Sequence, residues 1–171
     1  PPDSTPFPYT TPFRSLYMHQ EEAILRACND RLPFVVTSGT GSGKSLTYTI
    51  PIVDHVLRSD PSRQQVRAIL VYPMNALINS QLEAFHSYLQ RDGATHGVTV
   101  ARYTGQEQKE EKQRLQQHPP HILLTSLVML EYMLTRPGEG VFVDGKHADI
   151  NYIVLDELHT YRGRQGADGA L

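Results

Sequence analysis

Eight consecutive residues in the first third of the chain have the composition and spacing of a phosphate-binding loop. They run Ser38-Gly39-Thr40-Gly41-Ser42-Gly43-Lys44-Ser45. The glycines let successive backbone N–H groups point at one oxyanion. Lys44 supplies a mobile charge for outer phosphates, and the Ser45 hydroxyl can bind a magnesium ion. Ser38 stands where the pattern G-x-x-x-x-G-K-[ST] has glycine, but the last six residues fit. The alternative is a flexible Gly/Ser turn; in its context we predict a nucleotide-phosphate site.

Two neighbouring carboxylates follow an apolar run near the end of the sequence. The run Tyr152-Ile153-Val154-Leu155 precedes Asp156 and Glu157. Open α/β sheets bind ligands at the carboxyl ends of their strands. Asp156 can hold magnesium, directly or through water, and Glu157 can orient and deprotonate an attacking water. Alone, an Asp-Glu pair after a strand is common; together with the phosphate loop it predicts hydrolysis rather than transfer to a small acceptor.

Polar residues after two other apolar runs could contact nucleic-acid phosphates. Pro73-Met74-Asn75 and Thr125-Ser126 each follow a predicted strand and open a predicted helix. This geometry presents N–H and hydroxyl groups to backbone phosphates without reading bases. Ordinary helix capping by Asn75, Thr125 or Ser126 explains the same pattern equally well.

Gln20 lies on a predicted helix over residues 16–28, ahead of the phosphate loop. Its amide can both donate to and accept from an adenine edge. An exposed helical glutamine is the alternative, and the chemistry by itself favours that alternative.

Short apolar runs recur roughly every thirty residues, the length of one strand-helix repeat. They are Phe34–Val36, Ala68–Tyr72, Val98–Ala101, Ile122–Leu124 and Tyr152–Leu155. Helical patterns lie between them, and the charged run Gln106–Gln117 predicts a solvated helix with a Glu110–Arg114 pair. Nearly continuous apolar strands that alternate with helices predict an α/β fold with a parallel sheet covered on both faces.

The composition is that of a globular protein. At 171 residues the chain suits one domain over 14–171, and residues 1–13 hold five of the twelve prolines, which predicts an extended arm or linker. A net charge of −2 gives no global basic field, so any nucleic acid must be held by local contacts. Without a leader or a long apolar run, we expect a cytoplasmic protein with no membrane partner. The sequence starts without Met and stops in a helical pattern, so we expect a C-terminally truncated domain.

Together these motifs resemble the first RecA-like lobe of a superfamily 2 helicase of the DExH kind, over residues 16–171. Ser38–Ser45 resembles motif I, and Asp156-Glu157-Leu158-His159 resembles motif II. Leu16–Gln20 resembles the family's adenine-reading element, which reverses the interpretation of Gln20. Pro73–Leu77 with Gln81 resembles motif Ia, and Thr104-Gly105 and Thr125-Ser126 sit where motifs Ib and Ic would. The run Leu155–Ala167 is similar to DExH helicases that carry a C-terminal zinc-binding domain of the MrfA type.

The resemblance implies a three-layer α/β/α RecA-like P-loop NTPase domain, with ATP and Mg²⁺ as cofactors. It implies that His159 couples phosphate chemistry to movement, and that the track is single-stranded or partly duplex DNA, travelled 3′ to 5′. A second RecA-like lobe of the same chain would supply an arginine finger, worth roughly 10³ to 10⁵ in rate. We therefore expect the 171-residue chain to be a monomer that binds ATP but scarcely hydrolyses it.

Two alternatives stay open. One is an RNA-directed motor of the same fold, because a lobe that grips the backbone does not read the sugar. The other is a P-loop protein that is no motor, such as a small-molecule kinase or a nucleotide-gated interaction module.

Overall fold

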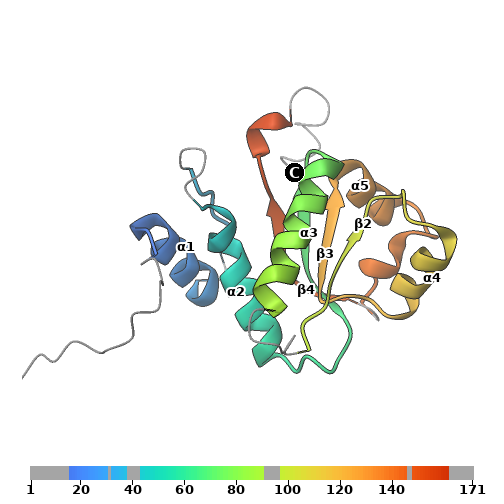
Figure 1. Ribbon diagram of the computed structural model, residues 1–171, viewed down its shortest axis with the longest axis horizontal. Helices are drawn as coiled ribbons and strands as arrows, with labels where there is room; N and C mark the ends of the chain where they lie inside the picture. The colour runs from blue at the N-terminus through green and yellow to red at the C-terminus, as the bar shows by residue number, and fades with distance from the viewer. Residues whose placement is uncertain (1–15, 31, 38–42, 91–96, 146–147, 162–171) are drawn as a thin grey trace, which may run out of the picture. The chain divides into compact units, whose positions relative to one another are not determined.

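The structure, a computed structural model, describes residues 16–30, 32–37, 43–90, 97–145 and 148–161 (Figure 1). The chain divides into two compact units, Pro1–Tyr48 and Thr49–Leu171. The predicted arm over residues 1–13 lies outside the described residues. Within the described part, every helix is too short or too polar to span a membrane.

The first unit contains helix α1, Met18–Asn29, which confirms the predicted helix over 16–28. Helix α2, Ser45–Arg58, begins in this unit and continues into the second. The predicted strand at Phe34–Val36 is wrong: residues 32–37 form no strand, and Val35 is 74% exposed. An apolar run becomes a strand only where a neighbour receives its backbone hydrogen bonds.

The second unit is built on a four-stranded parallel sheet. Its strands are β1 (Val66–Tyr72), β2 (Val100–Tyr103), β3 (Ile122–Ser126) and β4 (Ala148–Leu155). The sheet order is β2-β3-β1-β4, and every pair is parallel. The parallel sheet predicted from the apolar runs is confirmed. Strand β2 begins two residues later than expected: Val98 is buried, but it lies before the first residue of the strand.

Helices cover both faces of this sheet, which confirms the α/β prediction (Figure 1). Helix α5, Leu127–Thr135, places Met129 and Met133 in one core cluster with Ile69 and Val71 of β1. Side chains alternate between the faces of a strand. Helix α3, Asn75–Gln90, lies along the opposite face and buries Ile78 and Phe85.

Helix α4, Lys109–Gln117, is the solvated helix predicted from the charged run. In this helix Arg114 pairs with Glu111, whose Oε1 lies 2.7 Å from Arg114 Nη2. The predicted pair with Glu110 is therefore wrong. Residues three apart and residues four apart can both pair on a helix. Here Glu111, three residues before Arg114, presents both carboxylate oxygens to the guanidinium, at 2.9 and 2.7 Å. Two short 3-10 helices, η1 (Gly140–Phe142) and η2 (Leu158–Thr160), flank β4 in sequence.

The register of the sheet brings four strand ends to one edge. Val71 of β1 pairs with both Thr125 of β3 and Leu155 of β4, and Tyr103 of β2 also pairs with Thr125. Because all strands are parallel, the residues that follow β1, β2, β3 and β4 emerge on the same side of the sheet. This edge carries most of the candidate functional residues.

Candidate functional site

The end of the phosphate loop is fixed by a long-range contact within the first unit. Gln20 is 3% exposed; its Oε1 accepts from the backbone N–H of Tyr17 at 2.9 Å, and its Nε2 donates to the carbonyl of Gly43 at 2.9 Å. Gly43 has φ +71°, and a Cβ placed there would lie 2.5 Å from Gln20 Nε2. The structure therefore joins two residues that the sequence separates by 23 positions, and it requires glycine at one of them.

Helix α2 begins where a phosphate-binding loop requires a helix N-terminus. The Gly43 carbonyl accepts from Leu46 N at 3.1 Å, and the Lys44 carbonyl accepts from the Thr47 hydroxyl at 2.6 Å. A helix N-terminus combines free N–H groups with the positive end of the helix dipole. Lys44 and Ser45 thus open the helix as predicted, and this local geometry fits phosphate. The rest of the predicted loop, Ser38–Ser42, lies outside the described residues.

A pocket of about 280 Å³ lies beside α1 in the first unit. It is lined by His19, Glu22, Ala23, Arg26 and residues 34–37. The ring of His19 stacks on that of Tyr17, with centroids 5.7 Å apart. His19 Nε2 is buried and has no hydrogen-bond partner within the described residues. A buried polar atom without a partner is a candidate for a ligand contact. His19 lies within the run Leu16–Gln20 singled out in the sequence, but no role was predicted for it.

The two carboxylates lie directly after β4, as predicted. The backbone N–H of Asp156 donates to the Val71 carbonyl at 3.0 Å, and the Asp156 side chain accepts from Glu157 N at 2.9 Å. Glu157 has φ 51° and ψ 44°, the left-handed conformation that a non-glycine residue rarely adopts. Its side chain is 31% exposed, and its Oε2 lies 3.3 Å from His159 Nδ1. Such a residue can orient a water, while Asp156 is held close to the sheet edge.

The pKa of Tyr161 is shifted by its surroundings, Asp156 among them. Burial, and then the Asp156 carboxylate, raise the pKa of Tyr161 to about 12. Its hydroxyl is buried without a hydrogen-bond partner in the described part of the chain. The phenol of Tyr161 therefore stays neutral near Asp156 throughout the physiological pH range.

The residues after β1 and β3 open helices at the same edge. Asn75 is the first residue of α3, and the carbonyl of Met74 accepts from the N–H groups three and four residues later, those of Leu77 and Ile78. Met74 is 62% exposed. Ser126 is the N-cap of α5 and accepts from Met129 N at 3.3 Å, so the capping interpretation holds for this serine.

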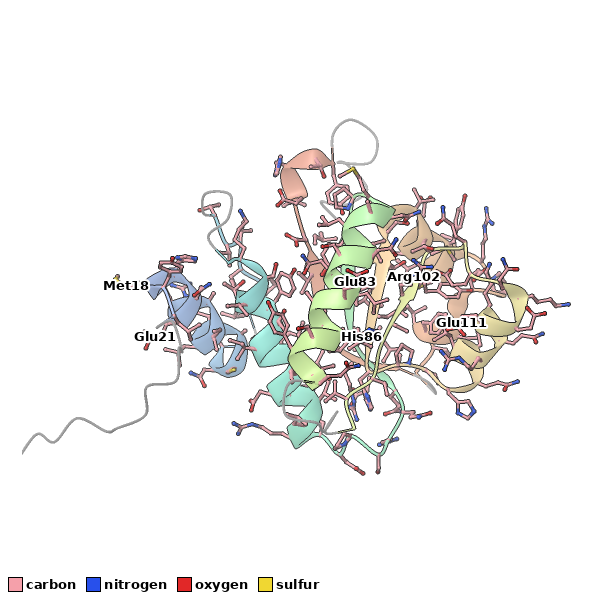
Figure 2. All side chains as sticks on the ribbon, viewed as in Figure 1. Met18, Glu21, Glu83, His86, Arg102 and Glu111 are labelled. Carbon is pink, nitrogen blue, oxygen red and sulfur yellow. The ribbon has the colours of Figure 1, made fainter. Side chains whose placement is uncertain are left out.

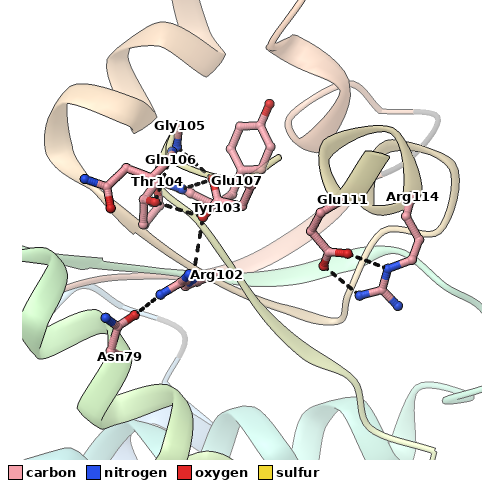
Figure 3. Close-up of polar contacts among 10 residues, drawn as sticks. Asn79, Arg102, Tyr103, Thr104, Gly105, Gln106, Glu107, Glu111 and Arg114 are labelled. Atoms are coloured by element: carbon pink, nitrogen blue, oxygen red, sulfur yellow. Dashed lines mark hydrogen bonds and ion pairs between the residues drawn. The ribbon is translucent and has the colours of Figure 1, made fainter. Parts of the chain in front are cut away.

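The turn after β2 is organised by a glutamate that the motif-based predictions missed. Glu107 accepts from Thr104 N at 2.9 Å, from the Thr104 hydroxyl at 2.8 Å and from Gly105 N at 2.9 Å (Figure 3). Its side chain is 4% exposed. The spacing Thr-x-x-Glu was a readable signal, because it is the pattern in which a glutamate returns to the N–H groups at a helix start.

Thr125 is turned into the fold. It is fully buried, and its hydroxyl donates to the Tyr103 carbonyl at 2.7 Å. This bond ties the end of β3 to the end of β2 and so positions the Thr104–Gly105 turn.

The structure therefore gathers the predicted residues into two groups. The second unit brings together, at one sheet edge, Pro73, Asn75, Thr104, Gly105, Thr125, Ser126, Asp156, Glu157 and His159. The first unit brings together Gln20, Gly43, Lys44 and Ser45. Ser45 and Asp156 belong to different units, and their joint magnesium site stays a prediction. No group of three His, Cys, Asp or Glu side chains within the described ranges is placed to hold a metal.

Comparison with known proteins gives consistent matches. The family model DEAD/DEAH box helicase matches residues 17–170. An uncharacterized ATP-dependent helicase of Methanocaldococcus jannaschii is 32% identical over 155 residues, 90% of this chain and 22% of the relative. An ATP-dependent RNA helicase of Vanderwaltozyma polyspora is 35% identical over 123 residues, 72% of this chain and 18% of the relative.

Among solved structures, the helicase MrfA bound to DNA and AMPPNP is similar, with a TM-score of 0.71 and 27% identity. The match covers 86% of this chain and 19% of that one. The chain thus spans about a fifth of the length of the proteins that it matches.

Proposed function

This chain belongs to the DEAD/DEAH box helicase family, and from that premise we propose that it is the ATP-binding lobe of an ATP-dependent helicase that moves on single-stranded DNA. The observation that carries the proposal is the sheet edge. There, one set of parallel strand ends presents Asp156 and Glu157 for hydrolysis, and the neighbouring strand ends present the turns at Asn75 and Thr104 for a polymer. Family membership argues against the alternative of a P-loop protein that is no motor.

The residues around the phosphate loop would bind Mg²⁺·ATP. Lys44 would meet the outer phosphates, Ser45 and Asp156 would hold the magnesium ion, and the loop from Ser38 would wrap the phosphate chain. Magnesium supplies charge neutralisation on the phosphates. The local fit rests on the helix start at Ser45 and on the left-handed Gly43, where the missing Cβ leaves room for the Gln20 amide. Gln20 would read the adenine edge from its position at Gly43.

Glu157 would position and deprotonate the attacking water. Its partly exposed carboxylate can accept a proton from a water molecule, and its backbone holds the rare left-handed conformation that is often found at active sites. His159, 3.3 Å from that carboxylate, would link the state of Glu157 to the segment that follows. Movement would require a second RecA-like lobe and its arginine finger.

The nucleic-acid backbone would be contacted by the residues that follow the strand ends: Pro73, Asn75, Thr104, Gly105 and Ser126. Thr125 would position the Thr104–Gly105 turn through its hydrogen bond to Tyr103. Contacts of this kind grip phosphates and do not read sequence. DNA is the favoured track because the similar MrfA structure holds DNA. RNA is the second candidate, because the relative from Vanderwaltozyma polyspora is an RNA helicase.

The test is ATP hydrolysis by the full-length protein, alone and with single-stranded DNA or single-stranded RNA. Stimulation by DNA and not by RNA is expected. Glu157→Gln is expected to lower the stimulated rate by about 10² to 10⁴ while leaving ATP binding intact, since only the general base is lost. Lys44→Ala should weaken ATP binding itself. Equal stimulation by RNA would favour the RNA track, and no stimulation by either would refute the motor.

A further inference from the structure

Arg102 is a cation held at the proposed nucleic-acid edge, and no predicted motif includes it. It lies in β2, paired with Leu124 of β3, two residues before Thr104. Its guanidinium Nη1 donates to Asn79 Oδ1 of α3, and its Nε lies 3.6 Å from Glu107 Oε1 (Figure 3). The side chain thus contacts both α3 and the turn that follows β2, and it lies beside α3 (Figure 2).

The position of Asn79 relates Arg102 to the proposed track. Residues four apart lie one above the other on a helix face, so Asn79 lies one turn below Asn75, the proposed phosphate contact at the start of α3. On its other side, Arg102 adjoins the Thr104–Gly105 turn through Glu107. Arg102 therefore lies between two of the turns that would follow the polymer backbone.

The contacts of Arg102 leave its side chain partly exposed and loosely paired. The distance of 3.6 Å to Glu107 exceeds that of a hydrogen bond. The Glu107 carboxylate already accepts three hydrogen bonds from Thr104 and Gly105. The Glu107 side chain is 4% exposed whereas that of Arg102 is 40% exposed, so an anion that approaches from solvent meets the guanidinium before the carboxylate.

We propose that Arg102 is a phosphate contact of the single-stranded DNA track, preorganised by Asn79 and Glu107. A guanidinium has five donors in a rigid fork that matches a phosphate. Holding it in place beforehand removes part of the ordering cost of binding. The inference rests on the proposed function, because it concerns the track of that same motor.

The test measures the affinity of the full-length protein for fluorescein-labelled oligothymidylate by anisotropy over a series of salt concentrations. Arg102→Gln is expected to weaken binding about fivefold to tenfold at low salt and to reduce the slope of log affinity against log salt by about 0.7, the share of one phosphate on a single strand. Arg102→Lys, which keeps the charge, should recover most of the slope.

Arg114→Gln is the matched control, because Arg114 is likewise paired with a glutamate, Glu111, but lies on α4 (Figure 3). It should leave affinity and slope unchanged. If Arg102→Gln behaves like Arg114→Gln, or lowers the melting temperature without changing the slope, the inference is overturned while the proposed function stands. If the unaltered protein does not bind the oligonucleotide, both are overturned.

Discussion

Replacing Gly43 with alanine tests how the phosphate loop is anchored. The residue has φ +71°, and the new Cβ would lie 2.5 Å from Gln20 Nε2. Holding an L-residue in the left-handed conformation costs about 1 kcal/mol or more. The Gln20 amide can swing away from the Cβ, but it is buried and bonded to Tyr17 N and the Gly43 carbonyl, so moving it strands a buried polar group at about 1–3 kcal/mol.

We therefore expect Gly43→Ala to lower the free energy of unfolding by roughly 2–4 kcal/mol, the sum of the two costs. In a Gln20→Ala background the collision is absent, so the same substitution should cost only about 1 kcal/mol. The difference between backgrounds is the coupling that a double-mutant cycle isolates. Urea denaturation of the four proteins measures it, and ATP-analogue binding should weaken in parallel with the loop distortion.

Gly145→Ala serves as the control, because a Cβ there meets no atom within 4 Å. It should change stability by less than about 0.5 kcal/mol. An equal cost of Gly43→Ala with and without the Gln20 side chain would refute the anchoring role of that contact.

Two further predictions concern the second unit. Thr125→Val replaces the buried hydroxyl that donates to Tyr103 and should cost about 1–3 kcal/mol in urea denaturation, with an unchanged m-value; a neutral result would show that this bond does not tie the strand ends together. Burial, and then the Arg67 charge, lower the pKa of His121, whose Nδ1 accepts from Thr99 N. The unfolded chain then takes up a proton that the native ring resists, so the free energy of unfolding should fall as pH drops below about 6.5. His121→Gln should flatten that pH dependence, and an unchanged slope would contradict this origin.

The sequence predicted those elements whose signal is local. Four apolar runs became the four parallel strands, because strands inside a parallel sheet are rich in apolar residues; β1 is buried along its whole length and Arg67 is its one charged residue. Asp156 and Glu157 were placed correctly at the end of β4, since the carboxylates follow the last apolar residue. The run Phe34–Val36 has the same composition and yet forms no strand, because composition does not supply a pairing partner.

Contacts between distant segments were decided by the tertiary structure. The motif placed Thr125 among the polymer contacts, but the pairing of β3 with β2 buries its hydroxyl against Tyr103. Arg102 belonged to no predicted motif; its contact with Asn79 arises because β2 and α3 lie side by side.

The sequence by itself determined which chemistry to expect, phosphate binding at Lys44 and a carboxylate pair at Asp156, because these predictions depend on residue type and short spacing. Only the tertiary structure decided which backbone and side-chain groups remain open to a ligand. That depends on strand register and on buried hydrogen bonds between residues far apart in the chain, such as the bond from Gln20 to Gly43.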